Sequence, residues 1–329
     1  MDDIWRTALF LSAAAILRGE TCEEGKRAFL AKDNSGAQQP LWNCVLDGAP
    51  NRDYAHQLTL TYRDLRNYDA GIARAEVALA SQPPSPDILY VLAFLHFRLG
   101  RQTDSIRDLG QAYRLDKEDW RVHQLFALNY VVLNIKDGAL ASFQNAIRLK
   151  PRNSELYYQL ARFYYSDNRP QESIEASRRA LDIFPDYPEV FNNLGLCHEA
   201  LASYDEARTN FERSIVLTEK TGARNEWPYI DYAAFLIKQD SAEQSLPLLR
   251  HAVEINPKSA KAYYFLGRAL GKLSRKAEAR RALEQSLSLD PNDPQPYYEL
   301  GMLLNKMGEA DAGQTMLRRF EAMRKRENP

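Results

Sequence analysis

The chain has 329 residues, and its 43 lysines and arginines nearly balance its 44 aspartates and glutamates, which leaves a net charge of −1. This balance argues against a dominant role in binding nucleic acid or an anionic membrane surface. The sequence contains no apolar run of about 18 residues, so we expect no transmembrane segment.

Residues 1–17 contain an apolar run, Thr7 to Leu17, that allows two interpretations. The run has about the length of the hydrophobic region of a secretory signal. However, Asp2 and Asp3 cancel the positive charge that such a signal normally carries, and no convincing cleavage site follows. The alternative is an N-terminal helix that packs on the helices after it. The localisation is therefore open, with the cytoplasm favoured and export as the alternative.

Residues 18–51 predict a pair of helices joined by a polar turn at residues 34–36. Pro40 is expected to interrupt the second helix unless it lies in the first turn of that helix. Cys22 and Cys44 fall at the same end of the two helices, so a disulfide between them is sterically conceivable. In a cytosolic protein both cysteines would stay reduced, and in an exported protein they would pair.

From residue 52 onward, apolar and small residues recur with a constant period. Within residues 260–293, two apolar stripes at helical spacing are separated by a polar turn near Ser274, and Pro291 ends the second helix. Gly267 and Ala279 are small, so two antiparallel helices can approach closely at these positions. One such hairpin cannot bury its own apolar faces, and we therefore expect copies stacked on either side.

This pattern resembles the tetratricopeptide repeat, whose 34-residue consensus carries W-x2-L-G-x2-Y, then A-x3-F, then Pro. The resemblance implies an all-α fold, a right-handed superhelical solenoid of helix-turn-helix repeats. Residues 1–51 then form an N-terminal helix and a degenerate repeat, and residues 52–329 form eight repeats with a basic C-terminal helix end. The predicted repeats are residues 52–85, 86–119, 120–153, 154–187, 188–225, 226–259, 260–293 and 294–320.

Two segments depart from the regular repeat. Residues 188–225 are four residues too long, and the excess falls around Thr221 to Asn225, where we expect a longer loop or a helix extension. The basic stretch Arg318 to Arg326 is expected to belong to the second helix of the last repeat, because basic residues near a helix C-terminus oppose the helix dipole favourably.

No catalytic or metal-binding motif is found. The histidines are scattered, and His96, His123 and His198 fall at packing positions, where core histidines are expected. The sequence has no Cys-x-x-Cys pair, so we expect no structural zinc site. We therefore expect a non-catalytic protein without a cofactor or a metal. An enzyme would require a pocket with converging acids, which a sequence cannot show.

The resemblance also implies which residues face a partner, because the first helix of each repeat lines the concave side in this family. The expected groove residues are Tyr90, Phe94, Phe97, Leu128, Val131, Tyr158, Arg162, Tyr165, Asn192, Tyr264, Arg268 and Tyr298. The first of them, from Tyr90 to Tyr165, would form an aromatic strip, and a more basic stretch would follow. Leu92 and Leu160 are expected to pack between helices instead.

The function implied is a non-catalytic scaffold or adaptor that binds a protein or peptide in its concave groove, within a multiprotein assembly. The alternatives are a self-assembling repeat array and a non-catalytic subunit of an envelope or export system. Neither the carboxylate clamp of chaperone-binding relatives nor the asparagine ladder of sugar-transferase relatives is present, since only Asn193 occupies the ladder position. The partner and the oligomeric state are left open.

Overall fold

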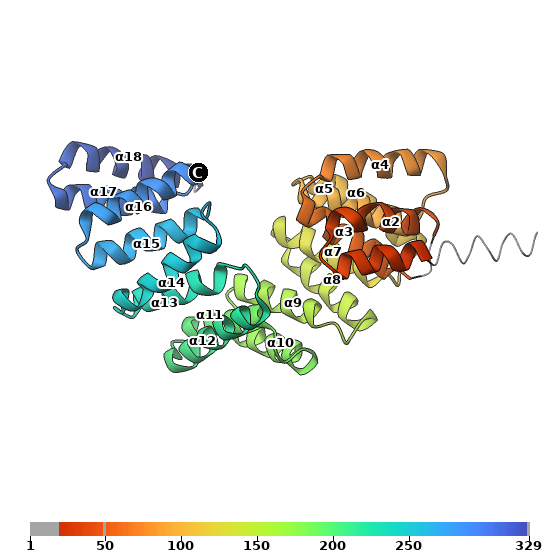
Figure 1. Cartoon of the computed structure of the whole chain (residues 1–329), viewed down its shortest axis with the longest axis horizontal. Helices are drawn as coiled ribbons and strands as arrows, with labels where there is room; N and C mark the ends of the chain where they lie inside the picture. The colour runs from red at the N-terminus through yellow and green to blue at the C-terminus, as the bar shows by residue number, and fades with distance from the viewer. Residues whose placement is uncertain (1–19, 49–50, 328–329) are drawn as a thin grey trace, which may run out of the picture. The chain divides into compact units, whose positions relative to one another are not determined.

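The computed structural model describes residues 20–48 and 51–327, and every regular element in this part of the chain is an α-helix (Figure 1). The predicted all-α class, a solenoid of helical hairpins, is confirmed. The apolar segment Met1–Leu17 lies outside the described residues. Within the described ranges, no helix is both long enough and apolar enough to cross a membrane.

The chain divides into two compact units, Met1–Leu156 and Tyr157–Pro329, and the boundary falls within helix α9. We call them the first unit and the second unit. Residues 20–30 are helical and precede α2. The helices up to the boundary are α2 (Asn34–Leu46), α3 (Asp53–Leu65), α4 (Tyr68–Ser81), α5 (Pro86–Arg98), α6 (Gln102–Leu115), α7 (Trp120–Val132), α8 (Lys136–Leu149) and α9 (Ser154–Ser166). The remaining helices are α10 (Pro170–Ile183), α11 (Pro188–Ala200), α12 (Tyr204–Thr221), α13 (Trp227–Lys238), α14 (Ala242–Ile255), α15 (Ala260–Lys272), α16 (Lys276–Leu289), α17 (Gln295–Met307) and α18 (Ala310–Glu327).

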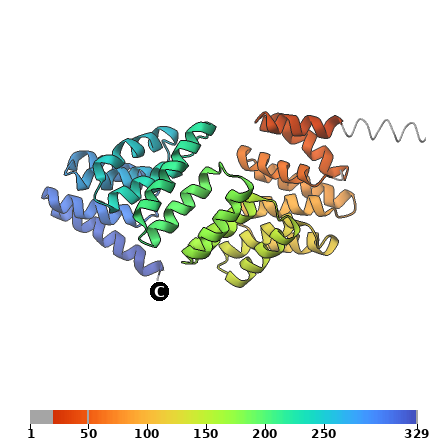
Figure 2. The ribbon, with the colours of Figure 1, turned by 90° about the horizontal axis from the view of Figure 1, so that it is seen from below.

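Within each unit, consecutive helices form hairpins that pack one on the next (Figure 2). In the second unit, α11 packs on α12 within one hairpin, and α13 packs on both of them. In the first unit, α5 packs in the same way on α3 and α4. The first helix of a hairpin therefore covers both helices of the hairpin before it, which buries the apolar faces that a single hairpin leaves open.

The turn inside each hairpin has the same backbone conformation. Counted from the start of each predicted repeat, the fifteenth residue lies in the left-handed region, with φ between 56° and 86°. Only two of these residues are glycines, although a left-handed conformation costs other residues about 1–2 kcal/mol. The residues are Lys32, Arg66, Gly100, Asn134, Asn168, Ala202, Asp240, Ser274 and Gly308. The packing of the two helices therefore determines the backbone conformation of the turn, and many residue types are accepted at this position.

Close packing inside the hairpins of the second unit depends on a glycine in the first helix and a large apolar residue in the second. A Cβ atom added at Gly195 would lie 2.6 Å from Cδ1 of Phe211. The same relation links Gly267 to Cγ of Leu283, also at 2.6 Å. In each case the large side chain fills the space that the glycine leaves, so the two helices can approach as the sequence predicted.

Helix α12 absorbs the excess of residues 188–225. It has 18 residues, whereas α10 and α14 have 14 each. The helix ends at Gly222, whose φ of 64° is left-handed, and residues 223–226 lead into α13. Of the two expected forms, the structure shows a helix extension of about one turn. The basic stretch Arg318–Arg326 lies in α18, the last helix, as expected.

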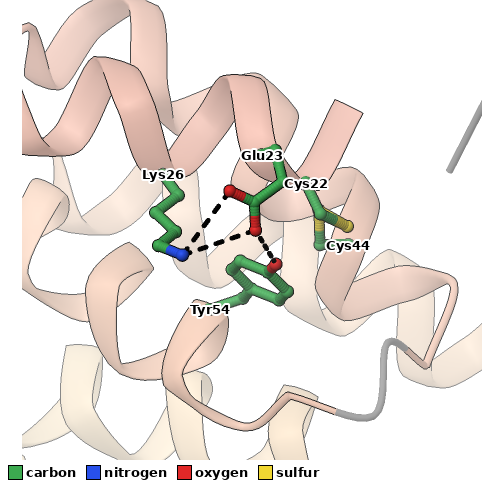
Figure 3. The surroundings of a disulfide bond; sticks show 5 residues. All are labelled: Cys22, Glu23, Lys26, Cys44 and Tyr54. Carbon is green, nitrogen blue, oxygen red and sulfur yellow. Dashed lines mark hydrogen bonds and ion pairs between the residues drawn. A yellow bond between two sulfur atoms is a disulfide. The ribbon is translucent and has the colours of Figure 1, made fainter. Parts of the chain in front are cut away.

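A disulfide joins the helix of residues 20–30 to α2 (Figure 3). Cys22 and Cys44 are both buried, and their Cα atoms lie 5.5 Å apart. Next to the disulfide, the Tyr54 hydroxyl donates to Oε1 of Glu23 at 3.0 Å, so α3 is tied to the same helix (Figure 3). The disulfide therefore ties the two helices of the N-terminal hairpin to each other, and the hydrogen bond ties this hairpin to the one that follows.

Two expectations for this hairpin were wrong in detail. The turn lies at residues 31–33, and α2 begins at Asn34, because the Asp33 side chain caps the helix by accepting from the Gly36 N–H at 2.9 Å. Pro40 lies inside α2 without ending it. Gly25 makes room for the proline ring, since a Cβ atom at Gly25 would lie 3.0 Å from Cβ of Pro40.

Candidate functional site

A cavity of about 250 Å³ lies in the second unit, where three first helices, α9, α11 and α13, meet. We call it the Asp231 cavity. Three of the predicted groove residues, Tyr158, Arg162 and Asn192, lie in its wall. Its full lining is Tyr158, Arg162, Glu189, Asn192, Asn193, Leu196, Asn225, Trp227, Pro228 and Asp231. The structure therefore brings together side chains that are up to two repeats apart in the sequence.

Two polar groups converge in this cavity. The Asn192 amide Nδ2 donates to Oδ2 of Asp231 at 2.7 Å. The Asn192 carbonyl oxygen Oδ1 is buried, and no described residue donates a hydrogen bond to it. Burial raises the pKa of Asp231, and the hydrogen bond from Asn192 opposes this effect only in part. The site thus holds a carboxylate that is poorly solvated and an acceptor that lacks a donor.

Aromatic and apolar side chains surround these polar groups. Trp227 is the first residue of α13 and is 50% exposed. The Arg162 guanidinium lies 5.9 Å from the centre of the Tyr158 ring. Asn193 has a different role, because its buried amide donates to Ser173 and Ser177 at 2.9 and 3.1 Å. Asn193 therefore fixes α11 on α10.

A second cavity, of about 680 Å³, continues from Asp231 along α13, α15 and α17. Apart from Asp231, its charged side chains are paired: Lys238 with Glu199 at 2.6 Å, Arg268 with Glu299 at 2.9 Å, and Lys261 with Asp293 at 3.8 Å. Tyr165 lies in this wall and is partly buried. Three of the predicted groove residues, Tyr165, Tyr264 and Arg268, thus line this cavity.

Tyr264 lines the second cavity but is only 4% exposed, so little of its side chain is accessible there, and its contact with a partner stays a prediction. The Phe265 ring packs edge-on against it, with centroids 4.9 Å apart. Lys261 and Arg268 also cover it, at 5.1 and 5.6 Å from the ring centre. Tyr298, by contrast, is 44% exposed and lines a smaller cavity beside Phe320.

Tyr90 in the first unit is buried at a position where the repeat predicts a groove residue. It is 2% exposed, because the Arg121 guanidinium covers its ring at 4.8 Å and its hydroxyl lies 3.0 Å from Nδ1 of His56. Burial raises the pKa of Tyr90 to about 12. Burial, reinforced by the charge of Arg121, lowers the pKa of His56 to about 4, so the imidazole is neutral at pH 7. Tyr90 belongs to a buried polar cluster, where a partner has no access to it.

The other groove residues predicted in the first unit keep part of their surface. These are Phe94, Phe97, Leu128 and Val131, and each is partly buried. Phe94, Phe97 and Leu128 pack against the apolar core of the first unit. Leu92 and Leu160 are buried, as expected for residues packed between helices. Whether the half-buried residues bind a partner stays a prediction.

Sequence reasoning missed Glu189, Trp227 and Asp231, which complete the Asp231 cavity. At Asp231 the sequence shows only that the asparagine-ladder position holds an aspartate. Its environment depends on Asn192, 39 residues earlier, and a linear pattern does not show that hydrogen bond. The period alone could have located Trp227, since it follows the start of its repeat by one residue, as Glu189 does.

The described residues contain no group of three or more His, Cys, Asp or Glu side chains that could hold a metal ion. His96 is a satisfied core histidine, because its Nδ1 lies 2.8 Å from Oδ2 of the buried Asp108. Cys197 is buried beside Ser173, and burial raises the pKa of its thiol to about 11, so it is not a reactive thiolate.

Sequence models of the tetratricopeptide repeat match residues 58–119, 152–220, 260–293 and 282–315. Together these ranges span more than half of the chain, and the chain belongs to the tetratricopeptide repeat family. The repeats of this family are generally protein-interaction scaffolds without a catalytic role of their own.

Two curated relatives are named as members of protein complexes. BBSome complex member BBS4 of Bos taurus is 24% identical over 148 residues, 45% of this chain and 28% of that protein. Anaphase-promoting complex subunit 3 of Schizosaccharomyces pombe is 22% identical over 202 residues, 61% of this chain and 30% of that protein. The chain thus spans less than a third of the length of either relative.

Among solved structures, the APC/C hetero-tetramer Cut9–Hcn1 is similar with a TM-score of 0.68 and 14% sequence identity. The similarity covers 82% of this chain and 52% of that chain. At this identity the similarity establishes the fold alone.

Proposed function

We propose that the chain is a non-catalytic adaptor that binds an extended segment of another protein along the first helices of the second unit. The observation that carries the proposal is the Asp231 cavity, where Asn192 Oδ1 is buried without a donor. A buried acceptor without a partner is costly, and a bound segment would supply the missing hydrogen bond. Half-buried aromatic side chains next to it are the kind of anchor that dominates binding energy.

The test is a pair of matched substitutions. Peptides that bind the intact chain are first selected from a random display library, and their dissociation constants are then measured with Tyr158→Ala and Tyr204→Ala. Tyr158 lines the Asp231 cavity, whereas Tyr204 is 47% exposed on the second helix α12. We expect Tyr158→Ala to weaken binding by about 5- to 30-fold, which corresponds to about 1–2 kcal/mol.

Tyr204→Ala is expected to change the affinity less than about twofold, because Tyr204 lies on a second helix, outside the proposed binding surface. Equal losses in the two variants, or a loss only in Tyr204→Ala, would place binding outside the groove. Thermal melts of both variants separate lost binding from lost folding. The alternative of a self-assembling array predicts instead a mass in solution that rises with protein concentration, and analytical ultracentrifugation measures that mass.

We further propose that the scaffold works in an oxidising compartment, because Cys22 and Cys44 are joined by a disulfide. The disulfide joins residues 22 positions apart. By restricting the unfolded chain, a bond that closes a loop of this length raises the free energy of unfolding by about 3 kcal/mol. Reduction is therefore expected to destabilise the first unit by about this amount. When the native host is quenched in acid and the protein is then unfolded with an alkylating reagent present, only Cys197 should be labelled, because it is the one free cysteine. Labelling of all three cysteines would contradict the proposal.

A further inference from the structure

The Asp231 carboxylate is an unbalanced negative charge in the wall of the Asp231 cavity. It accepts one hydrogen bond, from the neutral Asn192 amide at 2.7 Å. In the part of the chain that the structure describes, no lysine or arginine forms an ion pair with it. Partly buried carboxylates are normally paired with a cation, and Asp231 has no such ion-pair partner among the described residues.

The nearby cations are already engaged elsewhere. Lys238 pairs with Glu199 at 2.6 Å, and Arg268 pairs with Glu299 at 2.9 Å. Arg162 lies over the Tyr158 ring, at 5.9 Å from the ring centre. The charges of Arg162 and Lys238 offset the burial of Asp231 only in part, because neither forms an ion pair with it, and a cation from outside the chain would pair with the carboxylate directly.

The remaining wall of the cavity adds a second negative charge, an acceptor and an aromatic surface. Glu189 lines the cavity together with Asp231, and their two negative charges exceed the single positive charge of Arg162. Asn192 Oδ1 is a buried acceptor without a donor. Trp227 is half exposed at the start of α13, and its ring offers the aromatic face that a cation prefers.

We propose that the Asp231 cavity receives the side chain of a lysine or arginine carried by the bound protein segment. The ammonium or guanidinium group would donate to the Asp231 carboxylate and to Oδ1 of Asn192. The aliphatic part of the side chain would lie against Trp227 and Leu196, which both line the cavity. A carboxylate or phosphate group in the same place would be repelled by Asp231 and Glu189. This inference rests on the proposed function and specifies the chemistry of the partner.

The test uses short probes whose binding does not depend on finding the partner. Blocked tripeptides with glycine on either side of lysine or arginine are compared with matched neutral tripeptides that carry norleucine or citrulline. Binding to the full chain is followed by the NMR signal of the Trp227 indole N–H, assigned with Trp227→Phe. Physiological salt screens non-specific attraction between charges. We expect the cationic tripeptides to bind at least tenfold more tightly than their neutral counterparts.

Two charge-neutralising variants provide the matched control. Asp231→Asn should abolish the preference for the cationic tripeptides. Asp240→Asn should keep it, because Asp240 is 89% exposed beyond the end of α13 and pairs with Lys272 at 2.5 Å. Thermal melts check that both variants fold. Should Asp231→Asn fail to fold, the comparison of cationic and neutral tripeptides on the unchanged chain still decides the question.

The inference is overturned if neutral and cationic tripeptides bind equally, if no tripeptide shifts the Trp227 signal, or if folded Asp231→Asn keeps the preference. Each of these outcomes is distinct from failure of the proposed function, which the selected peptides and Tyr158→Ala decide. Selected peptides that need Tyr158 but contain no required lysine or arginine would leave the adaptor in place and remove only the cationic recognition.

Discussion

Replacing Arg121 with alanine is expected to lower the free energy of unfolding of the first unit by about 3–5 kcal/mol. Arg121 is fully buried in α7, and its guanidinium donates to both carboxylate oxygens of Asp119, from Nε at 2.9 Å and Nη2 at 2.6 Å. It also donates to Asp87 at 2.5 Å and to the Arg52 carbonyl oxygen. The alanine variant would leave the buried Asp119 carboxylate without its main cation.

The penalty should also depend on pH. Burial alone would raise the pKa of Asp119, but the hydrogen bonds and charge of Arg121 outweigh burial and lower it. The stability that this pair contributes is therefore fully present above the usual carboxyl pKa and is lost as the pH falls through the lower folded value. In Arg121→Ala the lone carboxylate would protonate more readily, so the difference between the two proteins should shrink in acid. Urea denaturation at neutral and acidic pH measures both effects.

Arg63→Ala is the matched control for this prediction. Arg63 also lies in the first unit, but its ion pair with Asp64 at 2.9 Å is exposed. Such pairs contribute about 0–1 kcal/mol. If Arg121→Ala lowers the free energy of unfolding no more than Arg63→Ala at neutral pH, the contacts of Arg121 with Asp87 and with the Arg52 carbonyl oxygen do not stabilise the first unit.

The second large effect is expected at Phe211 in the second unit. Phe211 is fully buried in α12, with ring centroids 5.7 Å from Tyr232 and 5.5 Å from Phe235. Phe211→Ala should lower the free energy of unfolding by about 3–5 kcal/mol, because it leaves a cavity between two hairpins. Gly195→Ala should cost about 1–3 kcal/mol, because its new Cβ would lie 2.6 Å from the Phe211 ring.

The double variant distinguishes this packing from two independent defects. In Gly195→Ala/Phe211→Ala the added methyl group occupies space that the ring has left, so the cost should be smaller than the sum of the single costs. Val216→Ala, on the same helix but 53% exposed, should be nearly neutral. Urea denaturation and amide exchange in α11 and α12 report the result. Additive costs would show that Gly195 and Phe211 do not determine how closely the helices pack.

The repeat could be predicted from the sequence because its contacts recur at fixed positions. Gly267 and Leu283 occupy the same two positions as Gly195 and Phe211, and each pair makes the same contact. Local spacing thus carries the information that defines the hairpin. The helix extension of α12 could be predicted for the same reason, since it shows as four extra residues in an otherwise constant period.

The polar clusters could not be predicted, because they depend on side chains that are far apart in the sequence. Arg121 contacts Asp87, 34 residues earlier, and this cluster buries Tyr90, which the repeat position alone places in the groove. Asp231 meets Asn192 across 39 residues in the same way. The period indicates which face of a helix a residue occupies, but the neighbouring charges decide whether that residue is accessible there.

Photo-crosslinking tests most directly whether a partner segment binds along the first helices of the second unit. A peptide selected on the intact chain is made with a benzophenone side chain, crosslinked to the chain, and mapped by mass spectrometry. We expect crosslinks in α9, α11 and α13, within residues 158–165, 189–199 and 227–238. Crosslinks confined to the second helices α10, α12 and α14, such as at the exposed Val216, would contradict it.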